Sequence, residues 1–235
     1  MSRPASPRRR LGALLAAAAF GLLPACPASP ADWSPELKAF ARDDAAHPSP
    51  PNVVLFIGSS SIQLWDTMAA DFPDVRVRNR GLGGAQISDL LVHFDRLVLP
   101  HQARLIVFYA GTNDLAAGKS PEQVAADFRE FCARVHAALP AARVLCLSAQ
   151  LNPARWALRD KFTLLNLYFA AYCTADPRRL YVETNVPMLT PEGNARSGFF
   201  REDQLHLSPA GYAVWRRLLT PLLTPGPAVP RPPQA

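Results

Sequence analysis

The chain has 235 residues, 49% of them hydrophobic and 19% charged, with a formal net charge of +6. That length suits one ordinary domain with a full hydrophobic core, and the balanced composition excludes a disordered, highly charged chain. The positive charge and the 24 prolines would favour an anionic partner or low-complexity sequence only if they were spread over the whole chain. Both are concentrated near the ends.

The first 25 residues predict an export signal. They contain four arginines and no acidic residue, and they include an apolar run of 13 residues, Leu11 to Leu23, as a signal peptide does. The run is shorter than the roughly 20 residues that span a bilayer, and no comparable stretch follows, so the sequence excludes an integral membrane protein. Without Arg3, Arg8, Arg9 and Arg10, 21 basic and 19 acidic residues leave a net charge of +2. We therefore expect no nucleic-acid partner.

Processing after the signal has two possible outcomes. Leu23-Pro24-Ala25-Cys26 resembles a bacterial lipobox, in which Cys26 would be lipidated and would attach the protein to a membrane. Ordinary cleavage near Ala25 or Ala28 would instead give a soluble periplasmic or secreted protein. We expect a Pro-rich tether over residues 26–33, one domain over residues 34–223, and a disordered Pro-rich tail over residues 224–235.

The segment between the tether and the tail alternates between strand-like and helix-like patterns. Ser34-Pro35-Glu36 predicts the start of a helix that ends near His47. The apolar run Val53 to Ile57 predicts a strand buried on both faces. Further strands are expected at 75–78, 105–109, 144–148 and 180–182, and further helices at 62–72, 87–99, 121–139, 156–175 and 209–223. This alternation predicts an α/β fold with a parallel sheet and helices on both faces.

In such a sheet the functional site lies beyond the carboxyl ends of the strands. Residues that could carry chemistry follow each of the first three predicted strands. These segments are Gly-Ser-Ser-Ser at 58–61, Asn-Arg-Gly-Leu-Gly-Gly at 79–84, and Gly-Thr-Asn-Asp at 111–114. The sequence therefore predicts a site where these three segments meet.

The serines after the first strand have three possible roles. A serine at a strand-to-helix junction sits among free backbone N–H groups and the positive end of the helix dipole, which stabilise an alkoxide or oxyanion. Ser59, Ser60 and Ser61 could instead cap the helix. A phosphate-binding loop is the third option, but the GxxxxGK[ST] pattern is absent.

A nucleophilic serine needs a base, and the chain has five histidines. Four are expected to be solvated or structural: His47, His93, His101 and His136. His206 lies in a loop, and Asp203, three residues earlier, can hold its Nδ1 and leave Nε2 free to accept a proton. The alternative is that the pair only staples the loop.

Acyl transfer also needs donors for the developing oxyanion. The turn from Gly81 to Gly84 can offer a backbone N–H because its glycines lack side chains, and Asn113 can offer its side-chain amide. A plain turn and a cap are the alternatives for these residues. The order of nucleophile, backbone donor, amide donor and base at successive strand ends favours acyl transfer.

Four segments together resemble the sequence blocks of the SGNH hydrolases, also called GDSL esterases and lipases: Gly58-Ser59-Ser60, Asn79-x-Gly81-x-x-Gly84, Gly111-x-Asn113-Asp114 and Asp203-x-x-His206. Residues 58–65 and 79–90 are similar to the branch that contains the alpha subunits of platelet-activating factor acetylhydrolase. The resemblance covers about residues 34–223. It implies a flavodoxin-like three-layer α/β/α fold with a five-stranded parallel sheet, and ester hydrolysis without metal or cofactor.

The resemblance also implies a role for each matching residue. Ser60 would be the nucleophile, His206 the general base and acid, and Asp203 the residue that orients His206. The oxyanion hole would consist of the N–H groups of Ser60 and Gly84 and the side chain of Asn113. The family usually has Asp before the nucleophile where this chain has Ser59. We expect this difference to affect the rate and the rigidity of the loop rather than the reaction type.

Other residues give weaker indications. Cys132, Cys146 and Cys173 fall in apolar patterns and are expected to be buried, with at most one internal disulfide if Cys26 is lipidated. The sequence has no CxxC motif and no His/Cys cluster that would predict a metal site.

The substrate is only partly indicated. Trp65, Arg155 and Trp156 could line a groove beside the site, or they could simply pack amphipathic helices. We expect acetyl or short-chain acyl esters as substrates, with O-acetyl groups on glycans as natural targets of an exported protein. The open alternatives are a non-catalytic carbohydrate- or lipid-binding protein and an acyltransferase.

Overall fold

The computed structural model describes residues 32–223. The predicted signal peptide, lipidation site at Cys26 and Pro-rich tail lie outside the described residues. Five parallel strands form one sheet in the order β2-β1-β3-β4-β5. The strands are β1 (Val54–Gly58), β2 (Val77–Gly81), β3 (Leu105–Tyr109), β4 (Arg143–Leu147) and β5 (Arg179–Val182). This order is flavodoxin-like, so the predicted parallel α/β architecture is confirmed.

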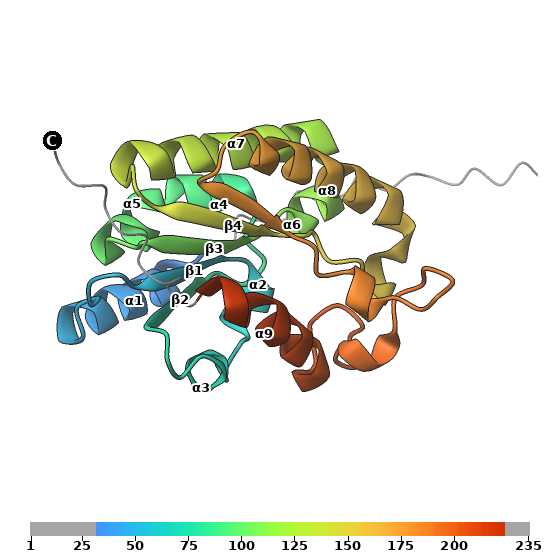
Figure 1. The fold of residues 1–235 in the computed structure, drawn as a ribbon, viewed down its shortest axis with the longest axis horizontal. Helices are drawn as coiled ribbons and strands as arrows, with labels where there is room; N and C mark the ends of the chain where they lie inside the picture. Colours follow the sequence, from blue (N-terminus) through green and yellow to red (C-terminus); the bar gives the residue numbers. More distant parts are fainter. Residues whose placement is uncertain (1–31, 224–235) are drawn as a thin grey trace, which may run out of the picture. The chain divides into compact units, whose positions relative to one another are not determined.

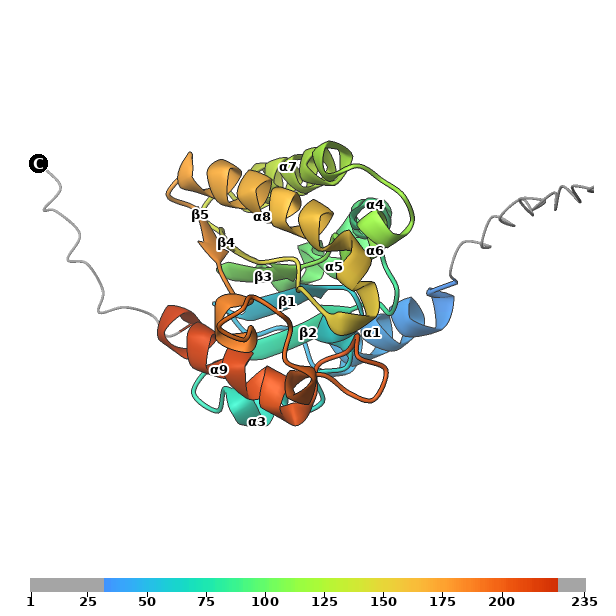
Figure 2. The same ribbon diagram turned by 90° about the vertical axis from the view of Figure 1, so that its right-hand side faces the viewer.

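Helices cover both faces of the sheet (Figures 1 and 2). The α-helices are α1 (Ser34–Ala46), α2 (Ser60–Gln63), α3 (Met68–Asp71), α4 (Ile87–Val92), α5 (Phe94–Leu97), α6 (Thr112–Ala116), α7 (Pro121–Ala138), α8 (Arg159–Thr174) and α9 (Pro209–Leu223). The 3-10 helices are η1 (Leu99–His101), η2 (Pro153–Leu158), η3 (Val186–Met188) and η4 (Ser197–Phe199). None of the helices between residues 32 and 223 combines the length and the apolar character that crossing a membrane requires.

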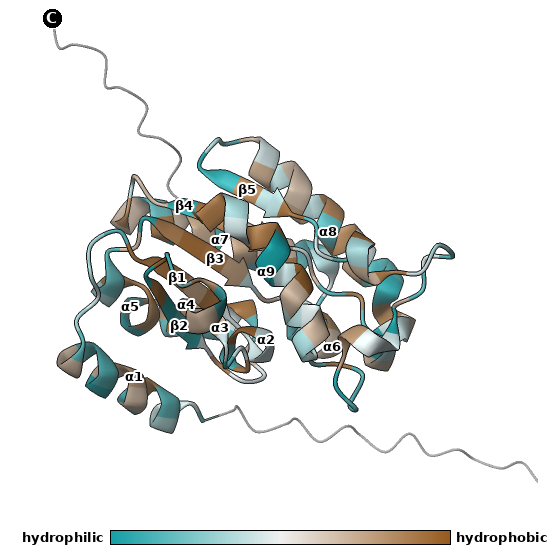
Figure 3. Cartoon of the chain, turned by 60° about the horizontal axis from the view of Figure 1, so that its bottom comes forward, coloured by the Kyte–Doolittle hydropathy of each residue, from teal (hydrophilic) through white to brown (hydrophobic). Residues whose placement is uncertain are grey.

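Alternate side chains of the three central strands, β1, β3 and β4, supply two separate hydrophobic cores. Leu55 and Ile57 of β1 pack into the core that α4, α5, α7 and α8 complete. Val54 and Phe56 pack into the opposite core, which α2, α3 and α9 complete. The central strands carry the hydrophobic colour in Figure 3. Because every residue of β1 is buried, its sequence is apolar throughout, as a strand with two covered faces requires.

Two helices predicted as continuous are broken in the structure. The segment 62–72 divides into α2 and α3, because the carboxylate of Asp71 accepts hydrogen bonds from Trp65 Nε1 and Thr67 Oγ1 at 2.7 Å each and holds the intervening turn. The segment 87–99 divides at His93, where α4 ends and α5 begins. The second strand also lies later than predicted, so Asn79 and Gly81 belong to β2 itself.

The packed domain includes the end of the predicted tether. Trp33 is buried and donates its Nε1–H to the carbonyl oxygen of Gly83 at 2.9 Å. Its ring meets His93 edge to face. Trp33 therefore joins the start of α1 to the glycine turn after β2.

Candidate active site

The turn after β1 places Ser60 at the first position of α2. Ser59 precedes it as the N-cap residue and donates its backbone N–H to the carbonyl of Tyr109 at 3.0 Å. A Cβ at Gly58 would lie 1.9 Å from that same carbonyl oxygen, so only glycine allows β1 and β3 to come this close. Within the described residues, the Ser60 N–H has no hydrogen-bond partner, and it is therefore free to donate to a ligand.

Three side chains from two distant segments form a hydrogen-bonded chain. Ser60 Oγ lies 3.0 Å from His206 Nε2, and His206 Nδ1 lies 2.6 Å from Asp203 Oδ2. Partial burial acts to raise the pKa of Asp203, but hydrogen bonds from the His206 side chain and from two backbone N–H groups lower it to about 2. Asp203 is thus an ionised acceptor at neutral pH, so Nδ1 of His206 carries the proton and Nε2 accepts from Ser60.

The loop before α9 is folded tightly around this pair. Asp203 Oδ1 accepts the backbone N–H groups of Leu205 and His206 at 2.9 Å each. The Arg201 N–H donates to the His206 carbonyl at 2.7 Å, beside an antiparallel bridge between Phe200 and Leu207. One carboxylate therefore fixes both the loop backbone and the imidazole ring.

The two other predicted oxyanion donors lie after β2 and β3. Gly84 has a φ of +74° and is exposed, a conformation that favours glycine. Among the described residues its N–H has no hydrogen-bond partner. Asn113 lies in α6, a short helix that the sequence analysis did not predict, and its Nδ2 donates to the Ala85 carbonyl at 3.1 Å. Its Oδ1 accepts from Arg155 Nη1 at 3.0 Å, so a second Nδ2 hydrogen remains available.

A buried ion pair connects these two segments. The carboxylate of Asp114 accepts the Ile87 N–H at the start of α4 and pairs with Lys119 Nζ at 2.9 Å. Lys119 also contacts Asp127 at 2.8 Å. Burial raises the pKa of Asp114, and Lys119 opposes that effect. Sequence reasoning missed this role of Asp114, although its position directly after Asn113 was a usable signal.

Asn79 has a similar structural role in the second block. Its Nδ2 donates to the Ile62 carbonyl in α2 at 2.6 Å, and its Oδ1 accepts the Gly81 N–H at 2.9 Å. Asn79 therefore joins the end of β2 to the helix that begins with Ser60.

A small polar cavity of about 10 Å³ lies beside Ser60, which is about the space that one water molecule needs. It is lined by Ser60, Ser61, Tyr109, Thr112, Asn113, Asn152, Arg155, Leu205 and His206. Gly84 does not line it. The geometry offers a nucleophile, a base and amide donors around one confined space, which suits acyl transfer.

The three predicted groove residues have different environments. Arg155 lines the cavity as predicted. Trp65 follows the other alternative, helix packing, because it is 1% exposed and packs against Phe56 and Tyr212 in the core. Trp156 lines a separate hollow of about 570 Å³ that includes Glu192 and Asn194.

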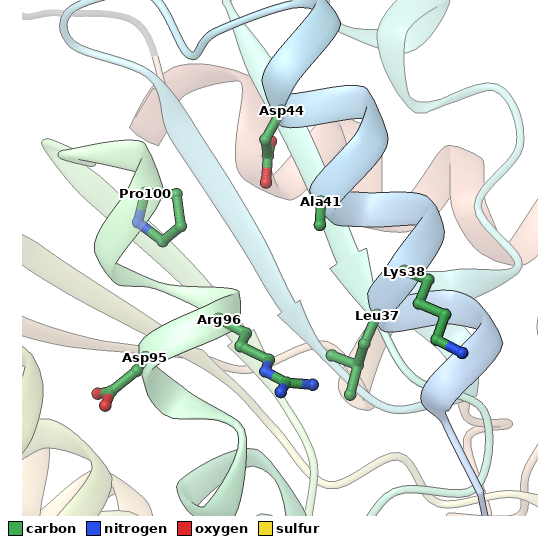
Figure 4. A pocket seen from close by; sticks show the side chains of 7 residues that line it. All are labelled: Leu37, Lys38, Ala41, Asp44, Asp95, Arg96 and Pro100. Carbon is green, nitrogen blue, oxygen red and sulfur yellow. The ribbon is translucent and has the colours of Figure 1, made fainter.

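Another groove, of about 620 Å³, separates α1 from the α5–η1 segment (Figure 4). It is lined by Leu37, Lys38, Ala41, Asp44, Asp95, Arg96 and Pro100. None of the four sequence blocks contributes to it, so this groove carries none of the chemistry described above.

Three cysteines and one further histidine are buried. Cys132, Cys146 and Cys173 are buried and unpaired in the described structure, as expected of small hydrophobic side chains. Between residues 32 and 223, no three His, Cys, Asp or Glu side chains cluster so that they could hold a metal ion. His101 is fully buried, with its Nδ1 2.7 Å from Ser49 Oγ.

Solved structures with the same fold include three bacterial proteins. A candidate platelet activating factor from Streptococcus pneumoniae is 20% identical, with a TM-score of 0.72 over 80% of this chain and 91% of that one. A GDSL-like lipase from Bacteroides thetaiotaomicron is 23% identical, with a TM-score of 0.69 over 80% and 96%. An acetylxylan esterase from Geobacillus stearothermophilus is 14% identical, with a TM-score of 0.59 over 74% and 95%.

No curated protein sequence matches this chain significantly. The sequence model of the GDSL-like lipase/acylhydrolase family matches residues 57–214. That match spans more than half of the chain and runs from the end of β1 into α9. It contains all four sequence blocks, three of which line the cavity. The chain belongs to the GDSL-like lipase/acylhydrolase family.

Proposed function

We propose that this protein is an exported serine esterase that hydrolyses acetyl or short-chain acyl esters. The observation that carries the proposal is the continuous chain from Ser60 Oγ through His206 to Asp203, with distances of 3.0 and 2.6 Å. A serine that only capped α2 would not need a base within hydrogen-bond distance, and a histidine that only stapled its loop would not need to reach Ser60.

The reaction would proceed in two acyl-transfer steps. Ser60 Oγ attacks the ester carbonyl while His206 Nε2 accepts the serine proton, and Asp203 stabilises the resulting imidazolium. The oxyanion accepts hydrogen bonds from the Ser60 N–H, the Gly84 N–H and Asn113 Nδ2. Collapse of this intermediate breaks the bond to the alcohol, which leaves with the proton from His206. Water, activated by the same histidine, then attacks the acyl-serine and releases the acid.

The size and polarity of the cavity support a small acyl group. Its volume of about 10 Å³ leaves little room beside Ser60, and Thr112 and Asn152 are among the polar residues of its wall. A long alkyl chain could not be buried there without displacing these side chains, and it would gain little from polar walls. We therefore expect activity to fall as the acyl chain lengthens.

The test is turnover of p-nitrophenyl acetate, butyrate and octanoate by the purified protein and by Ser60→Ala. The proposal predicts highest kcat/KM for acetate and only background rates for the variant. Equal rates for both proteins would exclude Ser60 as the nucleophile. Absence of any turnover would favour a non-catalytic binding protein. Ester products formed in the presence of a competing alcohol would instead favour an acyltransferase.

Export through residues 1–25 and attachment through Cys26 belong to the same proposal. In a bacterial host, a lipidated protein should incorporate labelled fatty acid and fractionate with membranes, and Cys26→Ser should abolish both. If the unaltered protein and Cys26→Ser are both soluble in the periplasm, ordinary cleavage is supported. Retention in the cytoplasm would contradict export.

A further inference from the structure

Arg155 is a cation without a counter-ion in the candidate site. It lines the cavity beside Ser60 and His206, and its Nη1 donates to Asn113 Oδ1 at 3.0 Å. In the described part of the chain it forms no ion pair with a carboxylate. Burial lowers the pKa of Arg155, so the protein keeps this charge partly desolvated at an energetic cost.

The backbone beneath Arg155 is held in place by buried polar contacts. The Arg155 N–H donates to Asn152 Oδ1 at 3.0 Å, which caps η2. Asn152 is itself buried and donates its Nδ2 to the Gln150 carbonyl at 3.0 Å. The guanidinium is therefore presented from a fixed segment rather than from a free loop.

Asn113 needs an orienting partner because its amide has two ends of similar shape. If the side chain turned by half a rotation, Oδ1 would face the oxyanion and repel it. Arginine has donors and no acceptor, so it can bond only to Oδ1. The Ala85 carbonyl selects the same orientation by accepting from Nδ2. Only Arg155 adds a charge, which draws electron density toward Oδ1 and makes the Nδ2 hydrogens stronger donors.

We propose that Arg155 is a positioning residue that fixes and polarises the Asn113 amide of the oxyanion hole. This inference rests on the proposed esterase function. It predicts that Arg155 acts on the rate of the chemical step and through Asn113, rather than on substrate binding. Replacing it should therefore lower kcat with little change in KM.

A double-mutant cycle in the full-length protein tests whether Arg155 acts through Asn113. Wild type, Arg155→Met, Asn113→Ala and the double variant are compared with p-nitrophenyl acetate. We expect Arg155→Met to lower kcat about 10-fold or more in the wild-type background and less than about 3-fold in the Asn113→Ala background. Rates of fluorophosphonate labelling, followed for hours, replace turnover for any variant too slow to assay.

Two further variants separate positioning from a general structural effect. Arg155→Lys keeps a charged donor and should recover part of the lost kcat. Arg159→Met removes an exposed arginine of the adjoining helix and should leave kcat unchanged. Equal fold-losses from Arg155→Met in both backgrounds, or a change confined to KM, would overturn the inference while leaving the esterase function intact. A wild-type protein without turnover or labelling would instead overturn the proposed function.

Discussion

His206 Nε2 lies 3.0 Å from Ser60 Oγ, although the two residues are 146 positions apart in the chain. The sheet order brings Ser60 and Asn113 together, because β1 and β3 are neighbours at the point where the strand order reverses. Ser60 follows β1, Asn113 follows β3, and the loop that carries His206 closes over the same edge. The site thus occupies the position where flavodoxin-like sheets bind their ligands.

The hydrogen-bonded chain predicts that its members act as a unit. Ser60→Ala and His206→Ala should each reduce kcat by at least about 10³-fold, and the double variant should be no slower than either single variant. Steady-state kinetics with p-nitrophenyl acetate measure this. His47→Ala, which alters an exposed histidine, should retain full activity. If the loss of kcat in the double variant equals the product of the two single losses, the two residues act separately.

Trp33 is predicted to support the glycine turn of the oxyanion hole. Trp33→Phe keeps an aromatic ring but removes the hydrogen bond to the Gly83 carbonyl, which stabilises the fold by about 1 kcal/mol. Because Gly84 follows directly, we expect kcat to fall several-fold while KM changes little. Trp156→Phe, outside the cavity, serves as the control. Lost stability with an unchanged kcat would mean that the turn holds its shape without Trp33.

Lys119 is predicted to neutralise a fully buried carboxylate. Lys119→Met would leave Asp114, which is 0% exposed, without its counter-ion and should destabilise the protein by about 3 kcal/mol. Adding Asp114→Asn to this variant should restore part of the stability, because the uncompensated charge is then gone. Urea unfolding at neutral pH measures both. A loss below about 1 kcal/mol for Lys119→Met would contradict this account.

His101 is predicted to make stability depend on pH. Burial, followed by repulsion from Arg80, lowers the pKa of His101 to about 4, below the value of about 6.5 in an unfolded chain. The unfolded state therefore binds a proton between these values while the folded state does not. The stabilising contribution is complete above about pH 6.5 and is lost as the pH falls toward 4, by up to about 3 kcal/mol.

Urea unfolding of wild type and His101→Phe across that pH range tests the effect. The unfolding free energy of wild type minus that of His101→Phe should decrease as the pH falls, because only wild type loses the contribution of His101. A constant difference for His101→Phe would contradict the lowered pKa.

The fold could be predicted from the sequence wherever burial dictates composition. The bounds of β3 and α9 match the prediction because apolar runs and the proline at the start of α9 mark them clearly. The broken helices could not be predicted, because tertiary hydrogen bonds to Asp71 compete with helix formation there. Local propensity is a weak guide when side chains offer the backbone such alternatives.

The candidate site was predictable to a similar extent. Asp203 and His206 are three residues apart, so their contact could be expected from the sequence alone. The contacts of Arg155 with Asn113 and of Trp33 with Gly83 join residues 42 and 50 positions apart, and no local pattern indicates them. The sequence could not decide between a groove and the core for Trp65, because an aromatic residue in an amphipathic pattern suits both equally.

Labelling by a fluorophosphonate, followed by peptide mass analysis, tests the central claim most directly. Such a probe reacts with a serine only if a neighbouring base activates it and an oxyanion hole accepts the phosphoryl oxygen. We predict one adduct, on Ser60, that forms in the wild-type protein and is lost in His206→Ala. An adduct on another residue, or equal labelling of Ser60→Ala, would contradict the assignment of this site.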